Sequence, residues 1–301
     1  MRRRLSAWLD AQLEQRLAER IDSRVRGELA RGLLETDRRF AALAEAAAGR
    51  ELSLDVLFGA GRPNDRTLSL ERYRDLVAEI RVLTGAEDVA LPLQRAYQTL
   101  LDHEARGLGR IAGTTYNILG KLVVPPLLQP ASGPVLEIGA LFALFSSALV
   151  RQFHRAGDFR SLTVLDPFAG TQVQDGKPGG RDRTGTPVTE QTARRNLAVL
   201  GLRADEVRLV CGYSTDPEVR SEAADRTYGV VVIDGDHSPA GVYRDLWWVQ
   251  ELVAPGGIVV VDDWGDPSWP GVEAAGRRYL IDGGRLQLLG RAATSAYLRQ
   301  P

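Results

Sequence analysis

The sequence predicts a doubly wound α/β sheet that follows an all-helical N-terminal region. After residue 134, short apolar runs alternate with helical stretches, and the runs Val230–Ile233 and Ile258–Val261 are apolar at every position. Such continuous apolar strands are expected where helices cover both faces of a parallel sheet. The preceding residues show helical spacing instead. We therefore predict a helical region, residues 1–130, and an α/β domain, residues 131–301.

Residues 1–50 are rich in Arg, Glu, Ala and Leu, and they contain no proline. Apolar residues recur every four positions from Leu5 to Leu33. A helix repeats at about 3.6 residues per turn, so this stripe would drift around one straight helix. We expect two shorter amphipathic helices, broken near Gly27 or Gly32, that pack or join copies of the chain into a homo-oligomer.

Three further helices are expected before the α/β domain. Glycine just past the end of a helix and proline near its start are typical boundary signals. Gly85 and Gly107 supply two such ends, and Pro125 with Pro126 supplies a third stop. The predicted helices are Ser69–Thr84, Pro92–Arg106 and Thr114–Leu122.

The α/β domain is predicted from seven strand-like runs with helices between them. The strands are Val135–Ile138, Leu162–Leu165, Val207–Val210, Gly229–Ile233, Ile258–Val261, Leu286–Leu289 and Thr294–Arg299. The helices are Leu141–Ala156, Thr189–Leu200, Pro217–Ala224, Ala240–Leu252 and Val272–Leu280. Ligands of a doubly wound sheet bind beyond the C-terminal strand ends. The long polar stretch Gly170–Pro187 is predicted to be a mobile loop over that edge, with disorder without function as the alternative.

Composition narrows the function classes. The formal net charge of the 301 residues is −1, which does not indicate a nucleic-acid partner or an anionic membrane partner. The one cysteine excludes an internal disulfide and a cysteine-cage zinc site, and it fits a reducing compartment. No stretch resembles a membrane span. We expect a cytoplasmic protein that binds neither nucleic acid nor membrane.

The turn after the first strand indicates a cationic ligand. A dinucleotide fingerprint needs glycines that let backbone amides close on a pyrophosphate. Here Glu137 stands at the first such position, two residues before Gly139, and its charge would repel phosphate. S-adenosylmethionine has an ammonium and a sulfonium and no phosphate, so it is favoured over a nicotinamide cofactor. Asp166 ends the second strand, where an acid binds ribose hydroxyls, although it could also cap a turn.

Carboxylates gather at the predicted ends of the fourth and fifth strands. Asp234, Asp236 and His237 follow one strand, and Asp262 with Asp263 follows the other. Close acids repel and retain protons unless a cation compensates them. Oxygen ligands favour Mg²⁺, so the predicted metal ligands are Asp234, Asp262 and Asp263. Strand alternation points the side chains of Asp262 and Asp263 to opposite faces, so both can bind the metal only if the chain curls there. Asp236 is assigned to capping the next helix or to orienting a partner.

The predicted metal would bind a substrate hydroxyl, lower its pKa and align it with the donor methyl group. His237 would take the proton as general base, together with Asp234, because the ordinary pKa of histidine lies near neutrality. The alternative is that His237 only supports its neighbours.

These motifs resemble those of class I S-adenosylmethionine methyltransferases, particularly the metal-dependent O-methyltransferases. Val135–Ala140 resembles the first motif of catechol O-methyltransferase, and Cys211–Asp216 resembles its Gly-x-Ser segment. Ile233–Ser238, Pro255–Gly257 and Val261–Trp264 resemble the signature of bacterial sugar, macrolide and antibiotic-tailoring methyltransferases, and of relatives named after cephalosporin hydroxylation. Together the matching motifs span residues 133–265.

The resemblance implies a Rossmann-like seven-stranded methyltransferase sheet and O-methylation of a small hydroxylated acceptor such as a sugar, polyketide or phenol. It places Glu137 and Gly139 on the methionine part of the donor, Asp166 on its ribose, and Ser214 and Thr215 beside its adenine. Asp234 would contact both donor and Mg²⁺. His237 falls where catechol O-methyltransferase has its catalytic lysine.

Some features depart from the family or lie outside its core. Ala143 stands where the family usually has glycine, so its methyl group is expected to crowd the donor. Tyr116 and Asn117 are candidates to close over the donor, and the N-terminal helices are expected to form a lid and dimer contacts. Two alternatives stay open: a metal-independent methyltransferase with His237 as base, and a non-catalytic module whose helices bind a protein.

Overall fold

Seven strands form one sheet in the order β3-β2-β1-β4-β5-β7-β6. The computed structural model describes residues 66–170 and 185–301, so the helices predicted within residues 1–50 and most of the 170–187 loop lie outside it. The strands are β1 Val135–Ile138, β2 Leu162–Asp166, β3 Val207–Cys211, β4 Tyr228–Ile233, β5 Val253–Val261, β6 Gln287–Ala292 and β7 Ser295–Arg299. Strands β1 to β5 pair in parallel, whereas β7 is antiparallel to both β5 and β6. All seven predicted strands are present.

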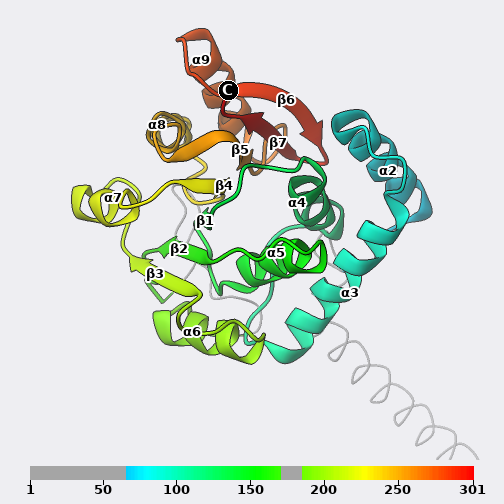
Figure 1. Cartoon of the computed structure of the whole chain (residues 1–301), viewed down its shortest axis with the longest axis horizontal. Helices are drawn as coiled ribbons and strands as arrows, with labels where there is room; N and C mark the ends of the chain where they lie inside the picture. The colour runs from blue at the N-terminus through cyan, green and yellow to red at the C-terminus, as the bar shows by residue number, and fades with distance from the viewer. Residues whose placement is uncertain (1–65, 171–184) are drawn as a thin grey trace, which may run out of the picture. The chain divides into compact units, whose positions relative to one another are not determined.

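The strand order reverses between β1 and β4, which lie side by side at the centre of the sheet (Figure 1). From β1 the chain first adds β2 and β3 on one side, then crosses to β4 and β5 on the other. Such a reversal leaves a crevice beyond the C-terminal strand ends, which is the usual ligand site of an open α/β sheet.

Alternate residues of the central strands pack into two separate cores. Val230 and Val232 of β4 belong to one buried cluster, whereas Val231 and Ile233 belong to the other. Successive side chains of a strand point to opposite faces, so a strand covered on both sides is apolar throughout. This explains the continuous valine and isoleucine runs of the sequence.

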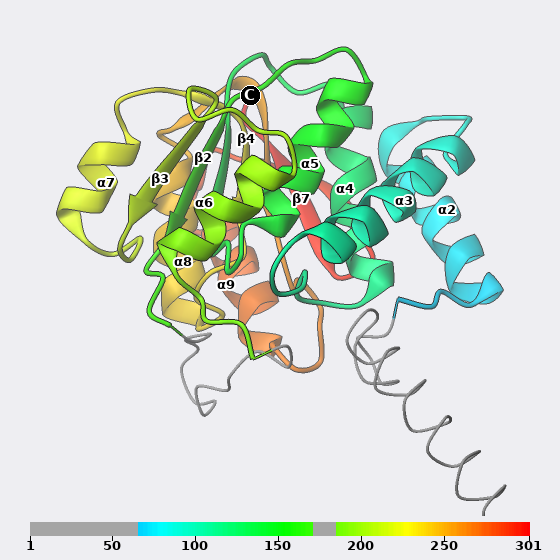
Figure 2. The same cartoon turned by 90° about the horizontal axis from the view of Figure 1, so that it is seen from below.

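Helices cover both faces of the sheet, as Figure 2 shows. One core includes residues of α2 Leu70–Thr84, α3 Ala90–Arg106, α4 Thr115–Leu127, α5 Leu144–Arg155 and α6 Glu190–Val199. The other includes residues of α7 Pro217–Ala223, α8 Pro239–Val249 and α9 Pro270–Ile281. Within residues 66–170 and 185–301, no helix is long and apolar enough to cross a membrane.

Helix α4 continues past the end that its two prolines predicted. Its first turn is capped as expected, since the Thr114 hydroxyl accepts a hydrogen bond from the backbone N–H of Asn117. The helix includes Pro125 and Pro126 and ends at Leu127. Each proline removes one backbone donor, but both stand in the last turn, and the helix is buried from Asn117 to Pro125. The predicted end at Leu122 is therefore wrong, because packing extends the helix.

Candidate functional site

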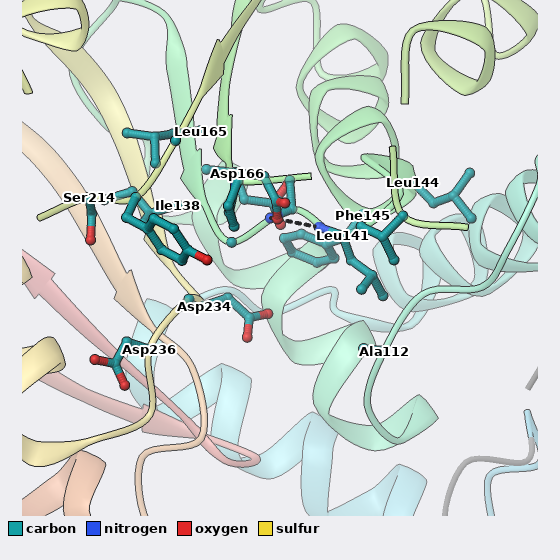
Figure 3. A pocket seen from close by; sticks show the side chains of 18 of the residues that line it. Ala112, Ile138, Leu141, Leu144, Phe145, Leu165, Asp166, Ser214, Asp234 and Asp236 are labelled. Atoms are coloured by element: carbon teal, nitrogen blue, oxygen red, sulfur yellow. Dashed lines mark hydrogen bonds between the residues drawn. The ribbon is translucent and has the colours of Figure 1, made fainter. Parts of the chain in front are cut away.

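A cavity of about 320 Å³ lies at the C-terminal ends of β1, β2, β3 and β4. Figure 3 shows Asp166, Ser214 and Asp234 around this space, each from a different strand end. All six residues predicted to bind the donor line it: Glu137, Gly139, Asp166, Ser214, Thr215 and Asp234. The segment before α4 also contributes Arg110, Ile111 and Ala112. The cavity therefore joins the sheet edge to part of the helical region.

Gly139 lets the turn after β1 approach the end of β4. Its φ of +85° lies in the left-handed region, and a Cβ built there would lie 2.3 Å from the carbonyl oxygen of Asp234. Any side chain at this position would collide with backbone that cannot move aside. The glycine is thus required for the close approach of β1 and β4 beside the cavity.

Glu137 places a buried carboxyl group in the cavity wall. Its side chain is 2% exposed, and Oε2 accepts a hydrogen bond from the Ser146 hydroxyl. Burial raises the pKa of Glu137 well above its ordinary value, the charge of Asp234 raises it further, and Lys121 opposes both effects. A cationic ligand at this wall would favour the ionised carboxylate.

Asp166 holds the turn after β1 and also reaches the cavity. Its Oδ2 accepts hydrogen bonds from the N–H groups of Ala140 and Leu141, both at 2.9 Å, and its Oδ1 accepts one from Phe168 N–H at 2.7 Å. A carboxylate can accept about four hydrogen bonds, so one position is left for a ligand hydroxyl. The turn-capping alternative is confirmed, and it is compatible with the ribose role, which stays a prediction.

Lys121 of α4 is a site residue that the sequence analysis did not identify. Its Nζ donates a hydrogen bond to Asp234 Oδ2 at 2.9 Å and another to Asp262 Oδ2. The side chain is 1% exposed and lines the cavity, and Nζ lies 4.7 Å from the ring centroid of Phe145. Burial lowers the pKa of Lys121, but Asp234 and Asp262 outweigh burial and raise it above its ordinary value. A fixed positive charge therefore joins the ends of β4 and β5.

Asp262 uses its other oxygen for neutral donors. Its Oδ1 accepts hydrogen bonds from the side chains of Asn117, at 2.8 Å, and Ser295, at 2.9 Å. Burial and the charge of Asp234 raise the pKa of Asp262, while Lys121 lowers it. Both oxygens of Asp262 thus have protein partners.

The chain curls after Asp262, as the metal prediction required. Asp263 has a φ of +54°, and its carboxylate Oδ2 lies 2.9 Å from His237 Nε2. The same nitrogen lies 3.6 Å from Asp234 Oδ1, and the imidazole stacks on Trp269 with ring centroids 4.6 Å apart. Asp263 therefore faces the histidine, and His237 connects it to Asp234.

The protonation of His237 differs from the sequence expectation. Burial lowers its pKa, but the hydrogen bonds and charges of Asp234 and Asp263 raise it to about 10. The imidazole is then protonated at neutral pH, whereas a general base has to be neutral. His237 also does not line the cavity, which Asp234 does.

A Mg²⁺ ion does not fit the carboxylates as they are arranged. Mg²⁺ needs oxygen ligands at about 2.0–2.1 Å in an octahedron. The ammonium of Lys121 lies between Asp234 and Asp262, and His237 pairs with Asp263. Among the described residues, no group of three or more His, Cys, Asp or Glu side chains is arranged to hold a metal ion. The sequence argument for a metal assumed uncompensated acids, and two cationic side chains compensate these.

Three other expectations differ from the structure. Tyr116 lies under the guanidinium of Arg72, with its ring centroid 5.0 Å away, and Asn117 binds Asp262. Neither side chain lines the cavity in this structure. Ala143 also lies outside the lining, and its fully buried side chain belongs to a hydrophobic core. Its methyl group therefore does not face the cavity in this structure.

A local signal could have identified Lys121. After Asn117, the helix Thr115–Leu127 is apolar except for Lys121, which lies four positions after Asn117. That spacing places two polar side chains on one face of a buried helix, where buried polar groups need partners. The sequence does not show what lies opposite, because Asp234 is 113 residues away.

Comparison with known proteins decides the class of the domain. Residues 136–264 match a family model described as a methyltransferase domain. The chain contains a methyltransferase domain. The match covers β1 to β5 and the cavity-lining ends of these strands, so the predicted fold and the predicted class, an S-adenosylmethionine-dependent methyltransferase, are confirmed.

Several solved structures are similar to this methyltransferase. The O-methyltransferase NovP shares 21% identity with a TM-score of 0.45, and the alignment covers 76% of this chain and 99% of NovP. The calicheamicin methyltransferase CalS11 shares 22% identity with a TM-score of 0.45, covering 77% and 94%. The O-methyltransferase TomG from Streptomyces achromogenes shares 18% identity with a TM-score of 0.43, covering 77% and 100%. No curated protein matches the sequence.

Proposed function

We propose that this methyltransferase transfers the methyl group of S-adenosylmethionine to a hydroxyl of a small molecule such as a sugar, polyketide or phenol. The observation that carries the proposal is the cavity, whose wall combines Glu137 and Asp234 at adjacent strand ends. Acidic groups in a partly apolar cavity suit the cationic end of this donor, and they disfavour a phosphate-containing cofactor.

The proposed donor position follows the order of the strands. Glu137 and Asp234 face the donor's methionine part, while Gly139 keeps the turn after β1 close to it. Asp166 at the end of β2 has one remaining position for a ribose hydroxyl, and Ser214 and Thr215 after β3 line the opposite end.

We assign Asp234 as the residue that contacts the acceptor. When bound, S-adenosylmethionine supplies an electrophilic methyl group, whose bond to sulfur breaks as a bond to the acceptor oxygen forms. Asp234 accepts a hydrogen bond from the acceptor hydroxyl and takes its proton during this transfer. His237 and Lys121 hold opposite oxygens of that carboxylate, at 3.6 Å and 2.9 Å. They position Asp234 and do not themselves have to meet the acceptor.

Two parts of the structure support enclosure of the acceptor and argue against a non-catalytic module. Arg110, Ile111 and Ala112 bring the helical region to the cavity, as a lid would. Ala143 motivated the non-catalytic alternative, and it lies in the core outside the cavity. That alternative has no other observation in its favour.

The test combines donor binding with methyl transfer. Titration calorimetry should show binding of S-adenosylmethionine, and mass spectrometry should detect methylated products among sugar, polyketide and phenol acceptors. Asp234→Asn should slow transfer by about 10² to 10⁴-fold, the usual contribution of a positioned acid or base. The exposed Asp205 provides a matched control, and Asp205→Asn should leave the rate unchanged. Absence of donor binding by the wild-type protein would refute the proposal.

A further inference from the structure

The position of Lys121 defines an internal cation site between two strand ends. Its ammonium contacts Oδ2 of Asp234 at the end of β4 and Oδ2 of Asp262 at the end of β5. Strands β4 and β5 are parallel neighbours, so their C-terminal ends bring the two carboxylates together. Lys121 comes from α4, on the helical side of the cavity, and it is almost fully buried.

The other oxygens of these carboxylates are also engaged. Asp262 Oδ1 accepts hydrogen bonds from Asn117 and Ser295, and the hydroxyl of Ser295 lies 2.8 Å from Asn117 Oδ1 as well. Asp263 and the outer oxygen of Asp234 face His237. A divalent ion bound by these acids would have to displace Lys121 and break this network. The network is therefore built for a monovalent side-chain cation.

A lysine at position 121 also suits a cation site between two carboxylates. The chain has 38 basic residues, and Lys121 and Lys177 are its only lysines. An arginine would present a planar fork of five donors, which needs more room and pairs side by side with one carboxylate. A lysine ammonium is a compact point charge with three donors, and it can lie between two separate carboxylates as a metal ion would.

We propose that the ammonium of Lys121 takes the place of a divalent cation between Asp234 and Asp262, so that methyl transfer by this chain requires no metal. The statement that methyl transfer requires no metal rests on the proposed function. The statement that Lys121 replaces a divalent cation concerns metal binding alone. Lys121 is a positioning residue here: it holds Asp234 at the cavity wall and balances the charge of Asp262.

Metal binding tests the replacement of a divalent cation by Lys121 without any substrate. We would titrate the apo protein with Mn²⁺ and follow the free ion by electron paramagnetic resonance. The wild type and Lys177→Met, a control for the loss of a lysine, should show no saturable site. Lys121→Met removes the charge but keeps a similar length, and it should gain one saturable, stoichiometric Mn²⁺ site.

Each result of this titration decides the inference. A stoichiometric Mn²⁺ site in the wild type would overturn it, and so would a folded Lys121→Met that gains no site. Circular dichroism establishes folding, because two buried acids lose their partner in this variant. If Lys121→Met does not fold, the double variant Lys121→Met and Asp262→Asn removes one acid together with the cation. The wild-type titration then still decides whether a metal site exists.

The activity measurement separates this inference from the proposed function. Wild-type methyl transfer should be the same, within about twofold, in chelator and in Mg²⁺. Loss of transfer in chelator with recovery in Mg²⁺ would overturn the inference and leave the proposed function standing. Failure to bind S-adenosylmethionine would refute the proposed function, whereas the Mn²⁺ result for Lys121 would remain valid.

Discussion

Glu137 is the residue whose ionisation should respond most strongly to the donor. Burial and the neighbouring Asp234 raise its pKa in the ligand-free protein. The ammonium and sulfonium of the donor favour the carboxylate, so binding lowers the pKa and releases a proton. Donor affinity should therefore rise with pH, by up to about tenfold per unit, until the pH passes the raised pKa of Glu137, and then level off.

Calorimetry in buffers of different ionisation enthalpy measures this proton release directly. Glu137→Gln provides the control, since it cannot ionise and should abolish both the proton release and this part of the pH dependence. Donor binding that takes up protons, or a Glu137→Gln variant with an unchanged pH profile, would contradict the assignment of Glu137 to the cationic end of the donor.

Substitution of Ala143 tests whether a departure from the family pattern affects binding of the donor. Its φ of +56° is a left-handed conformation that favours glycine, but its methyl group lies in the core and not in the cavity wall. Ala143→Gly should therefore change the Kd for S-adenosylmethionine by less than about threefold, which is about 0.7 kcal/mol. Titration calorimetry measures it, and a much tighter complex would show that the methyl group does crowd the donor.

These cavity-lining residues were predictable because each one lies at or near the end of a strand. Glu137, Asp166, Ser214 and Asp234 come at or just after the ends of β1 to β4, and parallel strands bring such positions to one edge. Lys121 was not predictable in this way, because a helix can approach the strand ends from several directions. The sequence argument for a metal left out Lys121 for this reason: the charge that compensates the acids is contributed by a distant helix.

At the scale of elements, the strands agree more closely with their predicted positions than the end of helix α4 does. Runs such as Val230–Ile233 are apolar throughout, which requires burial on both faces and leaves few alternatives. The end of α4 depends on a balance instead. Pro125 and Pro126 each cost a backbone hydrogen bond, and burial of the last turn outweighs that cost. No local pattern in the sequence shows how strongly burial stabilises this last turn.

A buried ion pair fastens the segment that leads from α3 to α4. Arg66 donates hydrogen bonds to both oxygens of Glu104, at 2.9 and 2.6 Å, and to the carbonyl oxygens of Ile111 and Gly113, at 2.5 and 2.9 Å. Glu104 also accepts a hydrogen bond from Ile111 N–H at 2.8 Å. Since Ile111 and its neighbour Ala112 line the cavity, the pair of Arg66 and Glu104 connects the stability of the helical region to the cavity wall.

Arg66→Ala should therefore lower the free energy of unfolding by about 3 kcal/mol or more, because it leaves the Glu104 carboxylate buried without its partner. It should also weaken donor binding, since Ile111 loses its support. The exposed pair Arg203 and Asp205 has the same 2.6 Å separation, so Arg203→Ala should cost less than about 1 kcal/mol. Denaturant unfolding and calorimetry measure both effects. Equal losses in the two variants would contradict the role given to burial.

At the scale of the whole molecule, the strand order connects the fold to the site. The strand order reverses between β1 and β4. The cavity begins at the C-terminal ends of these two strands and extends across the end of β2 to the end of β3. Asp262 and Asp263 lie on the other side of β4, at the end of β5, where Asp262 contacts Lys121 and Asp263 contacts His237. The antiparallel pair β6 and β7 lies farther along the same sheet and contributes no residue to the cavity.

This arrangement predicts which parts of the molecule respond to the donor. Segments around the cavity should exchange backbone hydrogens more slowly in S-adenosylmethionine, because a bound ligand lowers the population of locally open states. These segments are 110–112, 138–145, 165–167, 212–215 and 234–236. Most of β6 should exchange at an unchanged rate. Hydrogen–deuterium exchange with mass spectrometry resolves the two sets, and the exposed Glu218→Gln provides a variant that should reproduce the wild-type pattern. Protection confined to β6 and β7 would place the ligand elsewhere and would separate this cavity from the methyltransferase chemistry.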